Sequence, residues 1–251
     1  MMKKVTVPVL ILICVWLLSG CAAHADYYTI DHFYIKEEGE AFRRAFDEMV
    51  VDTYRWYQSI EGSEGVYILH FDHYDKELME EWVRSGYMEH IPEGDLDYFV
   101  LSVNYLEDRG MTFSESDKEQ IQAGVRYYLL PDTLTDEEAE SMKLYLTEDA
   151  LMGLDGDTLI DTPFRHDRKI RFESYHVDEP FTTPEGEAVL SPVIYVASSG
   201  NMSYFEAESL VATGIPDSYI FLTETAYKKY VKGALPKSLK DKRLTFSGVD
   251  F

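Results

Sequence analysis

The sequence predicts an α+β fold in which a mixed sheet packs against helices. Segments typical of strands alternate with segments typical of helices over the first two thirds of the chain. The composition is globular, since 45% of the residues are hydrophobic and 14% are aromatic. The two cysteines, Cys14 and Cys21, lie close to the N-terminus. The domain that follows must therefore be stabilised by a core rather than by disulfides.

The first half of the chain alternates between the two patterns. Runs of apolar and aromatic residues predict strands, and apolar residues three or four positions apart predict helices. The predicted strands are 27–35, 66–71 and 97–104, and the predicted helices are 39–60, Asp75 to about Ser85, and 116–122. In the second helix we expect Asp75 to cap the N-terminus. Its apolar residues are expected to face inward; these are Leu78, Met79, Trp82 and Val83.

A capped helix is the clearest element of the second half. Thr135 and Glu138 have the spacing of a capping box, and the helix is predicted to end near Leu151. Strands are predicted at 124–130, 169–177, 192–198 and 217–222, with helices at 203–212 and from 223 to Lys232. The segment 155–168 is the one candidate for a boundary inside the domain. The basic tail is assigned neither to a helix nor to a strand.

The N-terminal segment resembles the signal peptide of a bacterial lipoprotein. Lys3 and Lys4 precede an almost wholly apolar run, 5–18, which is shorter than the roughly 20 apolar residues of a membrane-spanning helix. The end of this run, Leu18, is followed by Ser19 and Gly20 and then directly by Cys21, as in a lipobox. The resemblance implies cleavage before Cys21 and a diacylglycerol group on its thiol.

An uncleaved N-terminal anchor is the alternative, because the segment 5–23 is just long enough to span a membrane. In both cases the chain divides into a signal peptide or anchor at 1–20, a linker at 21–26 and a globular domain at 27–251. We therefore expect the domain at the cell membrane, facing away from the cytoplasm.

The charge is strongly negative but unevenly distributed. The net charge is −23, and removal of Lys3 and Lys4 with the signal would make it −25. Such a balance argues against nucleic acid as a partner. The segment 228–243 has seven basic residues and one acid, Asp241. Its basic side chains are candidates for contact with anionic lipid or a partner protein; these are Lys228, Lys229, Lys232, Lys237, Lys240, Lys242 and Arg243. A solvated surface is the plainer interpretation.

The segment His70-Phe-Asp-His-Tyr-Asp75 contains residue types that bind metals. On a continuing strand, however, His70 and Asp72 would share one face and His73 and Asp75 the other. We therefore favour a structural role and expect no metal site. The acidic loop 155–161 lacks the ligand pattern of an EF-hand, and His166 and His176 are expected at a polar strand edge.

No motif predicts catalysis. The serine cluster 198–203 does not match the G-x-S-x-G elbow, and the sequence has neither a G-x-G-x-x-G fingerprint nor a P-loop. We expect a protein that is not an enzyme and uses no cofactor.

Five short blocks, in order, resemble the extracellular domain of the bacteriocin-associated integral membrane proteins, which are permease subunits of ABC-type exporters. The blocks are 103–106, 127–132 with the helix start at 135–140, 192–198, 218–223 and 235–240. Together they extend over roughly residues 95–245. The resemblance implies an outer domain that has a binding or gating role in export and no catalytic one. Because no apolar span follows before Phe251, it implies a separate accessory subunit or the leading half of a split permease.

Three functions are thus left to compare. The first is an accessory subunit of an ABC-type exporter in antimicrobial peptide export or immunity, with permease and ATPase subunits as partners. The acidic body would attract a cationic peptide. The second is a surface lipoprotein that binds peptide or sugar through some of its 19 tyrosines. A deep pocket lined by exposed aromatic residues would favour it. The third is a metal-dependent enzyme that uses His70, Asp72 and His73.

Overall fold

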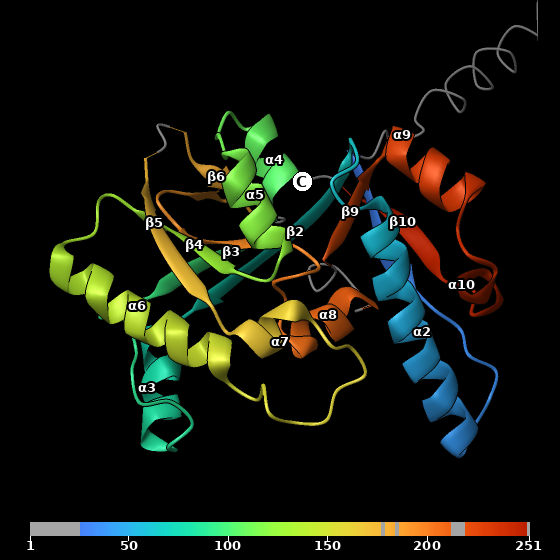
Figure 1. Cartoon of the computed structure of the whole chain (residues 1–251), viewed down its shortest axis with the longest axis horizontal. Helices are drawn as coiled ribbons and strands as arrows, with labels where there is room; N and C mark the ends of the chain where they lie inside the picture. The colour runs from blue at the N-terminus through green and yellow to red at the C-terminus, as the bar shows by residue number, and fades with distance from the viewer. Residues whose placement is uncertain (1–25, 177–178, 184–185, 212–218, 250–251) are drawn as a thin grey trace, which may run out of the picture.

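The computed structural model describes residues 26–176, 179–183, 186–211 and 219–249 (Figure 1). Cys21 and the predicted signal lie outside these ranges. The main sheet has eight strands in the order β10-β1-β9-β2-β3-β8-β4-β5. The strands are β1 (Tyr27–His32), β2 (Val66–Tyr74), β3 (Leu96–Ser102), β4 (Arg126–Pro131), β5 (Ile170–Tyr175), β8 (Val193–Ala197), β9 (Ile220–Thr223) and β10 (Thr245–Val249). Strand β3 is parallel to β8 and β4 is parallel to β5, whereas the other pairs are antiparallel.

Helices pack on both faces of this sheet. Above the central strands in Figure 1 lie α4 (Val103–Asp108) and α5 (Glu115–Gln122). The opposite face carries α2 (Gly39–Ile60), α3 (Lys76–Arg84), α6 (Asp136–Leu151), α7 (Pro163–Asp167) and α8 (Tyr204–Glu208), which continues into the short η1 (Ser209–Val211). The C-terminal part contains α9 (Glu224–Ala226), the π-helical η2 (Tyr227–Gly233) and α10 (Lys237–Asp241). The described helices and mixed sheet confirm the predicted α+β class.

Strand alternation gives the domain a core on each face of the sheet. In β4, Tyr128 and Leu130 belong to the larger core under α2 and α6, whereas Tyr127 and Leu129 belong to the core under α4 and α5. All four residues are buried, because neighbouring side chains of a strand point to opposite faces. This explains why the central strands read as continuous apolar runs rather than as an alternating pattern.

Several predicted elements have the predicted bounds. Helix α2 occupies Gly39–Ile60, and the Thr135 capping box is present at the start of α6. In that box the Glu138 carboxylate accepts a hydrogen bond of 2.8 Å from the Thr135 backbone N–H. The Thr135 hydroxyl in turn accepts one of 3.3 Å from the Glu138 N–H.

Other predictions were wrong in detail. The predicted strand 97–104 ends at Ser102 and turns directly into α4, where the Asn104 amide donates to the carbonyls of Ser63 and Val66. In α3, Met79 is buried, but Leu78 and Val83 are exposed. Asp75 occupies the N-cap position without a capping hydrogen bond from its side chain, and the Lys76 N–H donates instead to Asp95.

The C-terminal tail was not predicted to join the sheet. Strand β10 pairs with β1, so that Tyr27 lies opposite Val249. The loop after β5 also contains a small hairpin, β6 (Phe181–Thr182) and β7 (Ala188–Val189). The candidate boundary 155–168 contains α7, and strands from before and after it pair within the same sheet. Among the described residues, none of the helices combines the length and the apolar character needed to cross a membrane.

Candidate functional site

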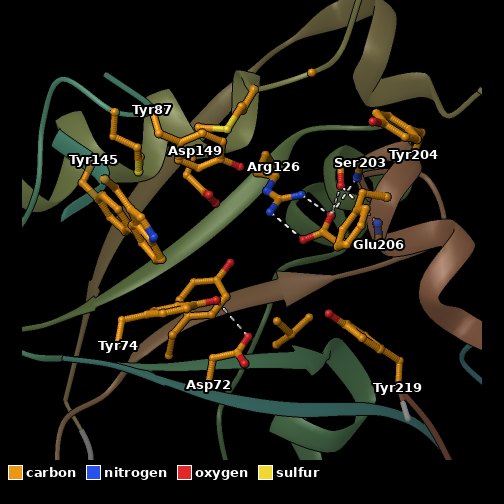
Figure 2. Close-up of a pocket in the computed structure, with 17 residues that line it drawn as sticks. Asp72, Tyr74, Tyr87, Arg126, Tyr145, Asp149, Ser203, Tyr204, Glu206 and Tyr219 are labelled. Carbon is orange, nitrogen blue, oxygen red and sulfur yellow. Dashed lines mark hydrogen bonds and ion pairs between the residues drawn. The ribbon is translucent and has the colours of Figure 1, made fainter. Parts of the chain in front are cut away.

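A cavity of about 480 Å³ lies between the centre of the sheet and helices α3, α6 and α8 (Figure 2). Strands β2, β3 and β4 supply its floor, and the three helices supply its walls. The lining residues are Asp72, Tyr74, Trp82, Tyr87, Met88, Tyr98, Val100, Arg126, Tyr145, Asp149, Met152, Gly153, Ser203, Tyr204, Phe205, Glu206 and Tyr219. Eight of them are aromatic, and they come from segments far apart in the chain.

Arg126 is the buried charge at the back of this cavity. It is the first residue of β4, and only 2% of its surface is exposed. Its guanidinium donates two hydrogen bonds to Glu206, of 2.5 and 2.7 Å, and its Nε–H donates to the Tyr128 hydroxyl at 2.9 Å. The guanidinium carbon also lies 3.8 Å from the centre of the Tyr195 ring. Burial opposes the positive charge, but Glu206 and the tyrosines keep the pKa of Arg126 well above its ordinary value.

Glu206 is fixed at the same time by its own helix. It is the third residue of α8 and completes a capping box with Ser203. Its carboxylate accepts hydrogen bonds from the Ser203 backbone N–H at 2.7 Å and from the Ser203 hydroxyl at 2.9 Å. The start of α8 and the buried charge of β4 are therefore held by one carboxylate, as Figure 2 shows.

Aromatic rings form most of the cavity surface. Tyr74 and Trp82 meet edge to face at 5.5 Å, and the Tyr74 hydroxyl donates to Asp72 at 3.1 Å. The rim is open, because Tyr87 and Phe205 are 61% and 67% exposed. The Tyr98 side chain, in contrast, is buried, and its hydroxyl has no hydrogen-bond partner among the described residues.

Asp149 is the second ionisable group with an unusual environment. It lies in the last turn of α6, lines the cavity and is an exposed residue, so protein groups surround a carboxylate that still contacts solvent. Burial raises the pKa of Asp149 to about 6, against a smaller opposing effect of Arg126 and with further contributions from Glu206, Asp72 and Glu148. The cavity thus contains three carboxylates and one guanidinium.

The segment 70–75, which has residue types that bind metals, is divided by the geometry of its strand. Strand β2 continues to Tyr74, so His70 and Asp72 share a face and bond at 2.9 Å, whereas His73 Nδ1 bonds to Asp97 at 2.7 Å. The two histidines therefore have separate partners, as the strand geometry predicted. Among the described residues, potential ligand atoms gather instead at an exposed group of His73, Asp75 and Asp95.

The acidic loop 155–161 and the histidines His166 and His176 make structural contacts. Asp161 bonds to His166 at 2.9 Å, Asp155 pairs with Arg168, and His176 bonds to Asp132 at 3.0 Å.

The serine cluster 198–203 is also used structurally. Ser198 donates to the Ile121 carbonyl at 2.9 Å, and Ser199 donates to Glu61 at 2.5 Å.

The basic segment lies on η2, α10 and the turn that follows. Lys228 pairs with Glu224 at 2.6 Å and Lys242 with Glu48 at 3.6 Å. Lys229, Lys232 and Arg243 lie over the rings of Tyr230, Tyr227 and Tyr34. Lys237 and Lys240 are exposed on α10.

The cavity was not predicted as a site. One local sequence signal was the spacing of Ser203 and Glu206, which matches a capping box. A second signal was an arginine at the start of an otherwise apolar strand. No protein-family model, curated protein or solved structure matches this chain, so the interpretation of the site rests on its geometry.

Proposed function

We propose that this protein is a non-catalytic binding protein that holds a small organic ligand in the aromatic cavity. The observation that carries the proposal is the cavity itself: about 480 Å³, eight aromatic residues, and a few polar groups fixed at its back. Ligand sites typically combine a largely apolar concave surface with a small number of oriented polar groups. The volume suits a ligand of the size of an amino acid, a short peptide end or a sugar unit.

Binding fits these side chains better than catalysis does. Neither histidine nor cysteine is present among the described residues that line the cavity. Its serine, Ser203, uses its hydroxyl in the α8 capping box, and Arg126 is occupied by Glu206. A nucleophile with an adjacent base, the usual arrangement for covalent catalysis, is therefore not found along the described lining.

Our proposal places the domain outside the cytoplasm, tethered through a lipid on Cys21. In support of a tether next to the basic segment, Tyr27 pairs with Thr223, immediately before α9 and the basic η2 helix. The linker 21–26 has six residues and reaches about 20 Å when extended. A lipid on Cys21 would keep the basic segment near the headgroups, where each lysine favours anionic lipid.

We further propose that the domain works as an accessory subunit of an ABC-type exporter for antimicrobial peptides. The support for this proposal is that five short sequence blocks resemble, in the same order, the extracellular domain of such permeases. These blocks include most of strands β4, β8 and β9. The net charge of −23 would steer a cationic peptide toward the domain.

Ligand binding is tested by a thermal-shift and tryptophan-fluorescence screen against amines, amino acids, short peptides and sugars. Trp82 lines the cavity and reports on its occupancy. The double variant Tyr87→Ala, Phe205→Ala removes the aromatic rim and should weaken binding at least tenfold. The matched control, Tyr34→Ala with Phe42→Ala, removes exposed aromatics elsewhere and should bind normally. The proposal fails if no compound binds saturably, or if both double variants bind alike.

Anchoring and partnership need separate experiments. Mass spectrometry of the N-terminal peptide from membranes should detect lipid on Cys21. Co-purification after mild detergent extraction should recover permease and ATPase subunits. Recovery of the protein alone at native expression levels would contradict the exporter proposal without affecting ligand binding.

A further inference from the structure

We infer that β5 is a self-association surface, on which a second copy of this chain adds its own β5 in antiparallel orientation around a two-fold axis at Phe172. The inference does not depend on the ligand cavity, because the residues of β5 do not line it. It depends on three features of β5: an open backbone edge, the order of its charged side chains and its half-buried apolar residues.

Strand β5 forms an open edge of the main sheet, toward the left in Figure 1. One side of the strand is parallel to β4, and among the described residues no strand pairs with its other side. Natural edge strands are often protected from pairing by proline, a bulge or short length. The six residues of β5 include no proline, and its register with β4 has no bulge. The opposite edge differs, since β10 contains Gly248 and its register with β1 shifts.

The backbone of β5 alternates between β4 and the open side. The carbonyls of Lys169 and Tyr175 accept hydrogen bonds of 2.8 and 2.9 Å from the N–H groups of Arg126 and Asp132. Successive residues of a strand direct their backbone groups to opposite sides within the sheet, so every second residue from Lys169 to Tyr175 faces β4. The N–H and C=O groups of the residues between them therefore face the open edge.

Three residues thus offer backbone groups that no described strand pairs: Ile170, Phe172 and Ser174. When a second β5 approaches in antiparallel orientation with Phe172 opposite Phe172, Ile170 lies opposite Ser174 of the second copy. The outward groups of one strand then meet the outward groups of the other, and each gains a hydrogen-bond partner.

The charged side chains select this register from those that backbone pairing allows. Arg171 and Glu173 are 35% and 43% exposed on the same face of the sheet and bond to each other at 2.8 Å, while Asp117 holds Arg171 at 2.7 Å. In the register centred on Phe172, Arg171 lies opposite Glu173 of the second copy, so unlike charges face each other across the two strands. A two-fold axis at Arg171 or at Glu173 would keep the backbone pairing but place like charges opposite each other.

Apolar side chains on the other face of β5 complete the surface. Ile170 and Phe172 are half-buried and pack on the larger core, where the Phe172 ring stacks on Tyr128 at 5.4 Å. At the two-fold axis the two Phe172 side chains become direct cross-strand neighbours, and aromatic pairs of this kind stabilise paired strands. Each Phe172 would cover exposed surface of the other.

A second copy of this chain fits the edge better than an unrelated strand. The charge order Arg-x-Glu becomes Glu-x-Arg when the strand runs in the opposite direction, so the edge is complementary to itself. An interface formed by the same surface of both chains closes after two copies and predicts a dimer rather than a filament. Because one pair of six-residue strands is a small interface, we expect a dissociation constant of roughly 10–100 µM.

The test is a charge reversal that only an interface can rescue. Sedimentation equilibrium of the full chain in density-matched detergent should show a concentration-dependent dimer. Arg171→Glu places acids opposite acids, and Glu173→Arg places bases opposite bases, so each variant alone should dimerise about tenfold more weakly. An equimolar mixture of the two variants restores unlike pairs and should dimerise as the wild type does.

Matched controls carry the same charge changes on α2, which lies away from β5 in Figure 1. Arg44→Glu and Glu40→Arg each reverse one member of an exposed ion pair and should dimerise as the wild type does. Ser174→Pro is a second kind of variant, because it removes an outward N–H without removing a bond to β4, and it should also prevent the dimer. Far-UV circular dichroism establishes that each variant is folded.

Each outcome decides the inference. A wild-type chain that remains monomeric about tenfold above the expected dissociation constant would overturn it. A dimer that both reversed variants form alone as well as the wild type does, or a mixture no stronger than either variant alone, would overturn it too. If Arg171→Glu fails to fold because it loses Asp117, Glu173→Arg and Ser174→Pro still distinguish a dimer through β5 from one through another surface.

Discussion

Glu206 holds the Arg126 guanidinium with both carboxylate oxygens while it caps the helix on which it lies. The two residues are 80 positions apart in the chain, and together they join β4 to α8. Because Arg126 is buried, this ion pair is also what allows a charged residue to occupy the back of the cavity.

Loss of the Glu206 charge should destabilise the protein strongly. Glu206→Gln leaves the buried guanidinium without a counter-charge, which typically costs roughly 3–5 kcal/mol. Ser203→Ala removes only the capping hydroxyl and should cost about 1 kcal/mol. Urea denaturation followed by circular dichroism measures both. A loss below about 1 kcal/mol in Glu206→Gln would show that solvent, rather than Glu206, compensates Arg126.

Replacement of both partners provides the control for that experiment. The double variant Arg126→Met, Glu206→Leu removes the charge and its partner together, so it should be more stable than Glu206→Gln. If the double variant were the less stable of the two, packing of the Arg126 side chain on Tyr195 would outweigh the electrostatic effect.

The ionised Asp149 carboxylate should lower the free energy of unfolding at neutral pH. Its folded pKa of about 6 lies above the ordinary value of 3.8, so the ionised carboxylate disfavours the folded state at higher pH. The charges that act on it are Arg126, Glu206, Asp72 and Glu148. We expect Asp149→Asn to be more stable than the wild type by about 1 kcal/mol at pH 7.5, after allowance for solvent in the cavity.

The difference in stability between Asp149→Asn and the wild type should become smaller as the pH falls. As the pH falls through about 6 toward 4, Asp149 gains its proton in the folded state first, and the two proteins should converge in stability. Melting temperatures measured from pH 4 to pH 8 test this. A gap that widened on acidification would contradict the assignment.

Gly200 should tolerate no side chain. A Cβ there would lie 2.0 Å from the Gln122 carbonyl oxygen, so Gly200→Ala must displace either the turn after β8 or the end of α5. We expect a loss of about 2 kcal/mol or more in denaturant unfolding. Gly94→Ala is the matched control, because no atom lies within 4 Å of its Cβ. Similar stability of the two variants would show that the Gln122 carbonyl moves easily.

The basic segment should bind anionic vesicles. The triple variant Lys229→Gln, Lys232→Gln, Lys237→Gln should lose roughly tenfold or more in affinity for phosphatidylserine vesicles, since each lysine near a surface contributes about 1 kcal/mol. The control variant changes Lys76, Lys143 and Lys169, which lie outside the basic segment, to Gln. Vesicle co-sedimentation measures both, and equal losses would indicate general charge attraction rather than a specific surface.

Local patterns were enough to predict the fold class and much of the secondary structure. Helix α2 and the Thr135 capping box depend on nearby residues alone, so the sequence indicated both. Strand β10 was missed because Thr245–Val249 is short and contains glycine, and it becomes a strand only by pairing with β1.

The cavity could not be predicted in the same way. Its residues extend from Asp72 to Tyr219 and meet only after the sheet and three helices assemble. Arg126 occurs within a segment that was correctly predicted as a strand, but its partner Glu206 lies in a helix that was only weakly indicated. Strand periodicity alone was enough to predict that His70 and His73 lie on opposite faces and take different partners.

The pairing of β1 also determines the order in which the sheet can be completed. Its two neighbours, β9 and β10, come from the far end of the chain, and the Thr29 hydroxyl donates to the Ile220 carbonyl across 191 positions. The first strand to be synthesised therefore has no partner until nearly the whole polypeptide is available. Contacts of such long sequence separation slow folding. A chain that emerges N-terminus first must keep β1 unpaired until its last strands arrive, which makes this edge the last part of the sheet to form.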